Sequence, residues 1–140
     1  MAPAPAPAPA PHLRLALVGF MGAGKTTLGR AVAEALHWPF LDLDRRIEQA
    51  AGANIPSLFA QGSEAAFRQW EALALQEVLQ RPGPWVLATG GGTPCWGGHM
   101  AQLKAATTTL YLELPPAALA QRLLAERRRK PRARPLIAHL

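Results

Sequence analysis

An eight-residue segment near the start of the chain has the composition of a phosphate-binding loop. Gly19 to Thr26 matches the pattern G-x-x-x-x-G-K-[ST] in full. Glycines let backbone N–H groups converge on an anion, and a helix that starts near Lys25 would add its positive end. We expect Lys25 to reach the β and γ phosphates and the Thr26 hydroxyl to bind Mg²⁺. The alternative is a chance match, but an apolar strand before the motif and an amphipathic helix after it argue against chance.

Two carboxylates, Asp42 and Asp44, lie two residues apart after a short apolar stretch. In an extended segment both would point to the same side. One could position Mg²⁺ or its waters, and the other could accept a proton from an attacking hydroxyl. The alternative is that Asp44 only caps the helix that follows. In a chain with a complete phosphate loop we favour the functional interpretation.

Arg68 and Glu71 lie three residues apart in a predicted helix and can therefore touch. A guanidinium held by a neighbouring carboxylate presents a good fork for the carboxylate of a substrate. The alternative is a surface ion pair that contributes about 0.3–0.5 kcal/mol. Taken without the other motifs, the pair favours this second interpretation.

Three consecutive glycines, Gly90, Gly91 and Gly92, follow a predicted strand. Such a run costs conformational entropy and makes sense where backbone amides must approach a ligand closely. A loop without a binding role is the alternative, and the position at a strand end argues against it. The nearby Cys95 is expected to be a small packed residue rather than a nucleophile.

The net charge of +6 comes from one cluster near the end of the sequence. Six of the 15 basic residues lie between Arg127 and Arg134, and the other nine balance the nine acidic residues. An arginine-rich lid that closes over the transferring phosphoryl group would explain this cluster. The alternative is a solvated, disordered run of charged residues. The two interpretations are compatible, because a lid without its ligand is often disordered. We expect no nucleic-acid partner, because the sequence predicts no sheet whose aromatic side chains could stack on RNA bases beside the cluster.

The order of expected elements predicts an α/β fold. Short apolar strands are expected at residues 15–18, 40–41, 85–88 and 107–114, with helices from about 25 to 36, from 63 to 80, up to Lys104 and after Pro116. Strands that alternate with helices indicate a parallel sheet with helices on both faces, a three-layer α/β/α arrangement. Ligands bind at the carboxyl ends of the strands in such sheets, and all the motifs lie there.

The remaining composition predicts a single soluble domain. Residues 1–12 alternate Ala and Pro and are expected to be a disordered tail, whereas residues 13–140 form the domain. No apolar run is long enough to cross a membrane. The chain has one cysteine and no signal peptide, which favours a reducing cytoplasm.

Taken in order, these motifs resemble the shikimate kinase family, which belongs to the P-loop NTPases of the nucleoside-monophosphate-kinase-like type. The specific matches are Gly-Phe-Met-Gly-Ala-Gly-Lys-Thr-Thr at 19–27, Asp-Leu-Asp at 42–44, Phe-Arg with Glu at 67–71, Ala-Thr-Gly-Gly-Gly at 88–92, and Arg-Pro-Leu at 134–136. The P-loop is shared by many families, but the combination in this order is specific.

The resemblance implies transfer of the ATP γ-phosphoryl group to the 3-hydroxyl of shikimate in chorismate biosynthesis, by a protein that binds shikimate and ATP. We also expect this protein to be a monomer. Nucleotide binding is assigned to Gly22, Ala23, Gly24, Lys25, Thr26, Thr27 and Arg134. The catalytic residues implied are Lys25, Asp44 and Arg134, and the metal ligands are Thr26 and Asp42. The substrate-binding residues are Asp44, Arg68, Gly90, Gly91 and Gly92. Arg134 belongs to a lid at about residues 127–137.

The sequence also departs from the pattern of the family that it resembles. Family members continue past the lid with a helix that carries a second carboxylate-binding arginine, an edge strand and a C-terminal helix. We therefore expect a truncated chain whose sheet lacks its last strand. The alternatives are a non-catalytic nucleotide-binding fragment and a related small-molecule kinase, such as one that acts on gluconate.

Overall fold

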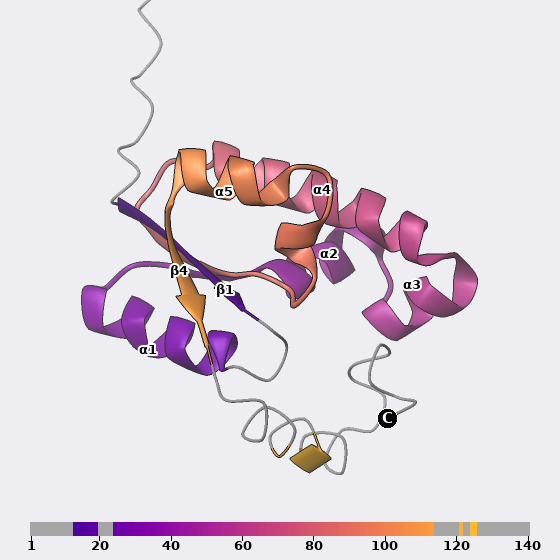
Figure 1. Ribbon diagram of the computed structural model, residues 1–140, viewed down its shortest axis with the longest axis horizontal. Coiled ribbons are helices and arrows are strands. Elements are labelled where there is room, and N and C mark those ends of the chain that lie inside the picture. The colour runs from indigo at the N-terminus through magenta and orange to yellow at the C-terminus, as the bar shows by residue number, and fades with distance from the viewer. Residues whose placement is uncertain (1–12, 20–23, 114–120, 122–123, 126–140) are drawn as a thin grey trace, which may run out of the picture.

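The four strands form one parallel sheet. The computed structural model describes residues 13–19, 24–113, 121 and 124–125. Its strands are β1 (Arg14–Gly19), β2 (Phe40–Asp42), β3 (Trp85–Ala88) and β4 (Thr108–Leu112), in the order β2-β3-β1-β4. Every adjacent pair is parallel, so all four carboxyl ends lie at one edge of the sheet (Figure 1). The expected parallel α/β sheet is confirmed.

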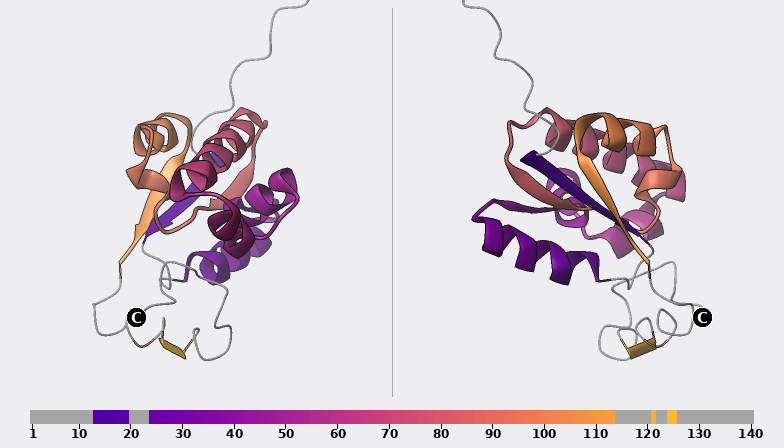
Figure 2. Two further views of the ribbon diagram at one scale, coloured as in Figure 1. Left: turned by 90° about the vertical axis from the view of Figure 1, so that its right-hand side faces the viewer. Right: turned by 60° about the vertical axis from the view of Figure 1, so that its left-hand side comes forward.

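Helices cover both faces of this sheet. Helix α1 (Lys25–Leu36) lies on one face, and α4 (Glu64–Gln80) and α5 (His99–Ala106) lie on the other. The two further views agree with this three-layer arrangement (Figure 2). Two shorter helices, α2 (Leu43–Ala51) and α3 (Ile55–Gln61), follow β2, and a 3-10 turn, η2 (Thr93–Cys95), precedes α5. The sequence analysis did not predict α3 or η2.

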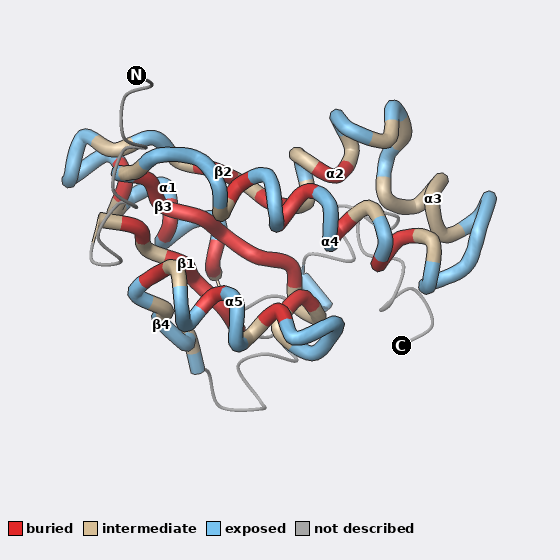
Figure 3. The backbone as a smooth tube through the Cα atoms, turned by 90° about the horizontal axis from the view of Figure 1, so that it is seen from above, coloured by how far each residue is buried: buried red, intermediate tan, exposed pale blue. Residues whose placement is uncertain are grey.

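The core is built on the two central strands. Every residue of β3 is buried, as are all but Leu15 of β1, and Figure 3 shows β3 buried along its length. Leu75 and Val78 of α4 pack against this layer without exposed surface. Continuous burial on two faces explains why these strands are unbroken apolar runs in the sequence. The outer strand β4 is half-buried or exposed at each position.

The ends of α4 show how local and distant residues define one helix. Ser63 is the N-cap, and its hydroxyl accepts a hydrogen bond from the Ala66 amide at 3.3 Å. The last turn of α4 has no basic residue of its own. Instead Arg14 of β1 donates to the carbonyls of Leu79 at 3.0 Å and Arg81 at 2.6 Å. A cation from another element thus supplies the charge that favours a helix C-terminus.

The expectation that the chain is extended from Asp42 to Asp44 is wrong. Strand β2 ends at Asp42 and α2 begins at Leu43, so the two carboxylates do not alternate along a strand. Asp42, rather than Asp44, is the helix cap, because its side chain accepts from the Arg45 amide at 3.4 Å. Asp44 lies in the first turn of α2, where a negative charge is favourable.

Several predictions fall outside the described residues. They are the Ala-Pro tail at 1–12, Gly22 and Ala23 of the phosphate loop, the helix start after Pro116, and the basic lid at 127–137 with Arg134. Within the described part of the chain, no helix is long and apolar enough to cross a membrane.

Candidate functional site

The predicted site residues that the structure describes converge on the carboxyl edge of the sheet. Strand β1 ends at Gly19, where the phosphate motif begins, and β2 ends at Asp42. Strand β3 leads through the buried Thr89 into Gly90. Because the strands are parallel, the three motifs that follow them meet at one edge, which is where ligands bind in open α/β sheets.

The phosphate motif leads into helix α1 at Lys25. Gly24 is the N-cap with a φ of 94°, a left-handed conformation that favours glycine. Lys25 is only 7% exposed, and its ammonium donates to the Gly19 carbonyl at 2.8 Å. This bond ties the start of the motif to its end. Thr26 and Thr27 are exposed in the first turn of α1, where the helix dipole is positive.

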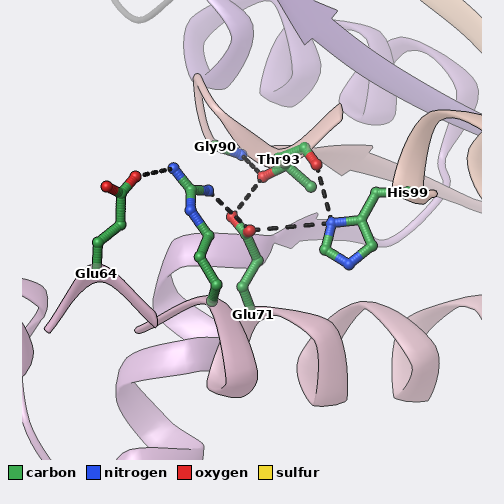
Figure 4. Close-up of polar contacts among 6 residues, drawn as sticks. Glu64, Glu71, Gly90, Thr93 and His99 are labelled. Carbon is green, nitrogen blue, oxygen red and sulfur yellow. Dashed lines mark hydrogen bonds and ion pairs between the residues drawn. The ribbon is translucent and has the colours of Figure 1, made fainter. Parts of the chain in front are cut away.

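Arg68 and Glu71 form a buried pair on α4, which excludes the surface-pair interpretation. Their side chains are 9% and 1% exposed, and Nη1 of Arg68 donates to Oε1 of Glu71 at 2.8 Å. Nη2 donates to the half-exposed Glu64 at 3.2 Å. Figure 4 shows Glu64 and Glu71 at the two ends of this chain of contacts. Within the described residues, the buried Nε of Arg68 has no hydrogen-bond partner.

Aromatic rings further fix the guanidinium of Arg68. Its Cζ lies 5.2 Å from the ring centroid of Phe67 and 5.2 Å from that of Trp96. Both distances are in the range of cation–π contacts. The arginine is thus held by two carboxylates and two rings, while its buried Nε has no hydrogen-bond partner among the described residues. A carboxylate of a ligand would match such a donor set.

The glycine run brings the other predicted substrate residues to Arg68. A Cβ atom on Gly92 would lie 2.5 Å from Nη2 of Arg68, and one on Gly90 would lie 3.0 Å from Oδ1 of Asp44. Asp44, Arg68 and the glycine run therefore belong to one cluster, although they come from three different elements. The Gly90 amide already donates to the Thr93 hydroxyl at 2.9 Å. Ligand binding by the backbone therefore depends on Gly91 and Gly92.

Two residues of this cluster were missed by the sequence analysis. Thr93 is fully buried, and its hydroxyl donates to Oε2 of Glu71 at 2.8 Å. His99 lies beneath the same turn, with Nδ1 2.9 Å from the Thr93 carbonyl oxygen (Figure 4). Because a carbonyl oxygen can only accept, Nδ1 donates in this bond. No local pattern marks either residue, since Thr93 and Glu71 are far apart in the sequence.

The expectation that Cys95 is packed is wrong, because Cys95 is exposed.

Comparisons with known proteins agree with this arrangement. The family profile described as shikimate kinase matches residues 21–139. A shikimate kinase from Bacteroides fragilis is 41% identical over 119 residues, which are 85% of this chain and 66% of that protein. A solved structure, "Shikimate kinase from Acinetobacter baumannii in complex with shikimate", superposes with a TM-score of 0.77 at 41% identity, covering 84% of this chain and 65% of the other. A shikimate kinase structure from Bacteroides thetaiotaomicron gives a TM-score of 0.80 at 38% identity, covering 91% and 69%.

The chain is shorter than these proteins. It spans 66% of the length of the Bacteroides fragilis protein, just under two thirds.

Proposed function

Because the chain belongs to the shikimate kinase family, we propose that it transfers the γ-phosphoryl group of ATP to the 3-hydroxyl of shikimate. The observation that carries the proposal is the cluster of Arg68, Asp44 and Gly92 at the end of β3. The Arg68 guanidinium and the Asp44 carboxylate lie at the edge of the sheet where the phosphate motif begins, and in the proposal they bind the carboxylate and a hydroxyl of shikimate.

The nucleotide is bound by the segment between β1 and α1. Lys25 at the start of α1 is the phosphate ligand in the proposal, and its buried ammonium lies beside the Gly19 carbonyl, to which it donates at 2.8 Å. The positive end of α1 and the Gly24 turn favour the same anion. Gly22, Ala23, Thr26 and Thr27 complete this binding segment in the proposal.

Shikimate is a carboxylate with three hydroxyl groups, and the cluster supplies a partner for both chemical types. The terminal nitrogens of the Arg68 guanidinium, which also donate to Glu71 and Glu64, would bind the carboxylate. A buried guanidinium binds an anion more strongly than an exposed one, because water competes less. The amides of Gly91 and Gly92 would add hydrogen bonds from the adjacent turn.

Asp44 orients the acceptor hydroxyl and receives its proton. In the transfer, the hydroxyl oxygen of shikimate forms a bond to the γ-phosphorus, and the bond from this phosphorus to the β,γ-bridging oxygen breaks. The electron pair of the broken bond leaves with ADP, and the hydroxyl proton passes to the Asp44 carboxylate. Lys25 and Arg134 would offset the negative charge on the transferring group.

Mg²⁺ is the metal that the proposal requires, and the available side chains suit it. Thr26 and Asp42 offer oxygen donors, which this hard cation prefers, and the ion takes only one or two protein ligands beside substrate phosphates. Thr26 is exposed at the start of α1 and Asp42 is half-buried at the carboxyl end of β2. When bound, the ion would neutralise charge on the β and γ phosphates.

We propose further that the protein acts as a cytoplasmic monomer without a nucleic-acid partner.

The test is shikimate-dependent release of ADP by the purified protein with ATP and Mg²⁺. We expect turnover in the wild type and in Lys104→Met, which changes an exposed lysine on α5, and none in Lys25→Met. Gluconate in place of shikimate should give no turnover. A wild-type protein that ATP stabilises against heat but that releases no ADP with shikimate would be a nucleotide-binding fragment, and the proposal would be wrong. Turnover with gluconate in place of shikimate would also refute it.

A further inference from the structure

A continuous chain of hydrogen bonds joins the glycine turn to Arg68. The Gly90 amide donates to the Thr93 hydroxyl at 2.9 Å, and this hydroxyl donates to Oε2 of Glu71 at 2.8 Å. Oε1 of the same carboxylate accepts from Arg68 at 2.8 Å. We propose that Thr93 is a positioning residue, which sets the separation between the glycine turn and the Arg68 guanidinium. The inference rests on the proposed function, because these two groups are the proposed ligands of the shikimate carboxylate.

The hydroxyl group is the part of Thr93 that makes this connection. A hydroxyl can accept from one neighbour and donate to another at once, which an aliphatic side chain of the same size cannot do. Thr93 and Glu71 are both 0% exposed, so water cannot replace the missing partner. Loss of the hydroxyl would leave the Gly90 N–H and one carboxylate oxygen unpaired inside the protein.

The backbone of Thr93 is held as firmly as its side chain. Its carbonyl accepts from Nδ1 of His99 at 2.9 Å, and its amide donates to the Gly90 carbonyl at 3.2 Å. Nδ1 of His99 is also 3.9 Å from Oε1 of Glu71, which is too long for a hydrogen bond. Helices α4 and α5 are thus both tied to the turn that carries Gly91 and Gly92.

The position of this hydrogen-bond chain predicts that Thr93 affects the binding of one substrate and not of the other. The hydrogen-bond chain contacts the acceptor side of the site, through Arg68 and the glycine turn. Lys25, the proposed phosphate ligand, lies at the start of α1 and donates to the Gly19 carbonyl at the end of a different strand, β1. Disturbing Thr93 should therefore weaken shikimate binding and leave ATP binding unchanged.

Three variants test this inference against a matched control. Thr93→Val keeps the shape and removes the hydroxyl, and Thr93→Ser keeps the hydroxyl. Thr107→Val removes another buried hydroxyl, which makes hydrogen bonds of 2.7 Å to the Leu103 carbonyl and 2.8 Å to the Thr109 hydroxyl. Thr107 precedes β4 at the amino edge of the sheet, away from the site.

We expect Thr93→Val to raise the KM for shikimate about tenfold, equivalent to about 1.4 kcal/mol, with the KM for ATP unchanged. Thr93→Ser should restore the KM for shikimate to near the wild-type value. Thr107→Val should lower the melting temperature about as much as Thr93→Val and change neither KM. Amide exchange at Gly90 should be faster in Thr93→Val than in Thr107→Val.

The possible outcomes separate this inference from the proposed function. Wild-type protein without shikimate-dependent turnover would contradict the proposed function, and the inference would fall with it. An active wild type in which Thr93→Val and Thr107→Val share the same KM for shikimate would overturn the inference alone. Equal increases of the two KM values in Thr93→Val would also overturn it, because they would indicate general loss of structure.

Discussion

Gly92 lies against the guanidinium of Arg68, so close that a Cβ atom at this position would be 2.5 Å from Nη2. The backbone of Gly92 has a φ of −100°, which any residue can adopt. The need for glycine here is therefore one of space rather than of backbone conformation. The guanidinium of Arg68 fills the space that a side chain at position 92 would need. It can approach the turn this closely because glycine has no side chain.

We predict that Gly92→Ala weakens shikimate binding without unfolding the protein. The added methyl group must displace the end of the Arg68 side chain, which is flexible enough to move but would then lose its alignment with Glu71. A tenfold loss of affinity is about 1.4 kcal/mol, a reasonable size for one misaligned charged hydrogen bond. Calorimetric titration with shikimate measures the affinity, and ATP-dependent stabilisation serves as the control. Unchanged shikimate affinity would show that the turn accommodates the methyl group.

Arg68→Lys should impair shikimate binding although the positive charge is kept. An ammonium cannot replace the planar fork, which contacts Glu71 and Glu64 and still presents further donors. We expect the KM for shikimate to rise at least about tenfold, with little change in the KM for ATP. Arg46→Lys is the matched control, because Arg46 forms a 3.7 Å pair with the exposed Glu77. Equal effects of the two substitutions would contradict a specific role for Arg68.

The strands and the longest helix were predictable because their signals are local. Trp85–Ala88 is an unbroken apolar run, and the structure gives β3 these same bounds. Ser63 followed by Glu64 is a local capping signal, and α4 begins there. Helix α3 also had local signals that were not used. Asn54 caps it by accepting from the Ser57 amide at 2.9 Å, and Pro56 lies in its first turn.

The interior of the site was less predictable, because its contacts depend on packing. The pairing of Arg68 with Glu71 follows from helical spacing, but its burial does not. Thr93 reaches Glu71 only because η2 folds over α4, an arrangement that no sequence pattern specified. Asp44 was assigned to the same extended segment as Asp42, which is the last residue of β2. The Asp42 side chain instead caps α2, which begins at the next residue and includes Asp44.

A third prediction concerns stability alone. Arg14→Met should lower the free energy of unfolding by about 2–3 kcal/mol, because the buried guanidinium donates to the Leu79 and Arg81 carbonyls, which would lose these partners. Both KM values should stay unchanged, since Arg14 begins β1 at the amino edge of the sheet. Urea denaturation and steady-state kinetics provide the two measurements. A selective rise in the KM for shikimate would contradict this separation between the two edges.

Trp96 offers an optical signal for binding at Arg68. Its ring is 42% exposed, and the Arg68 guanidinium lies 5.2 Å from its centroid. Among the other tryptophans, Trp85 is buried beside Arg14, 5.4 Å from that guanidinium, at the opposite edge of the sheet. A carboxylate that binds Arg68 changes the charge beside the Trp96 indole, so shikimate should alter the intrinsic fluorescence.

We predict that Trp96→Phe abolishes most of this fluorescence change and leaves the shikimate affinity within about threefold, because a phenyl ring still stacks on the guanidinium. Trp96→Ala should abolish the change and also weaken binding severalfold, since the guanidinium then loses one of its two aromatic contacts. Fluorescence titration and calorimetry on the same samples separate the signal from the affinity. If Trp96→Phe retained the full fluorescence change, the signal would come from another tryptophan, and shikimate would not bind beside Trp96.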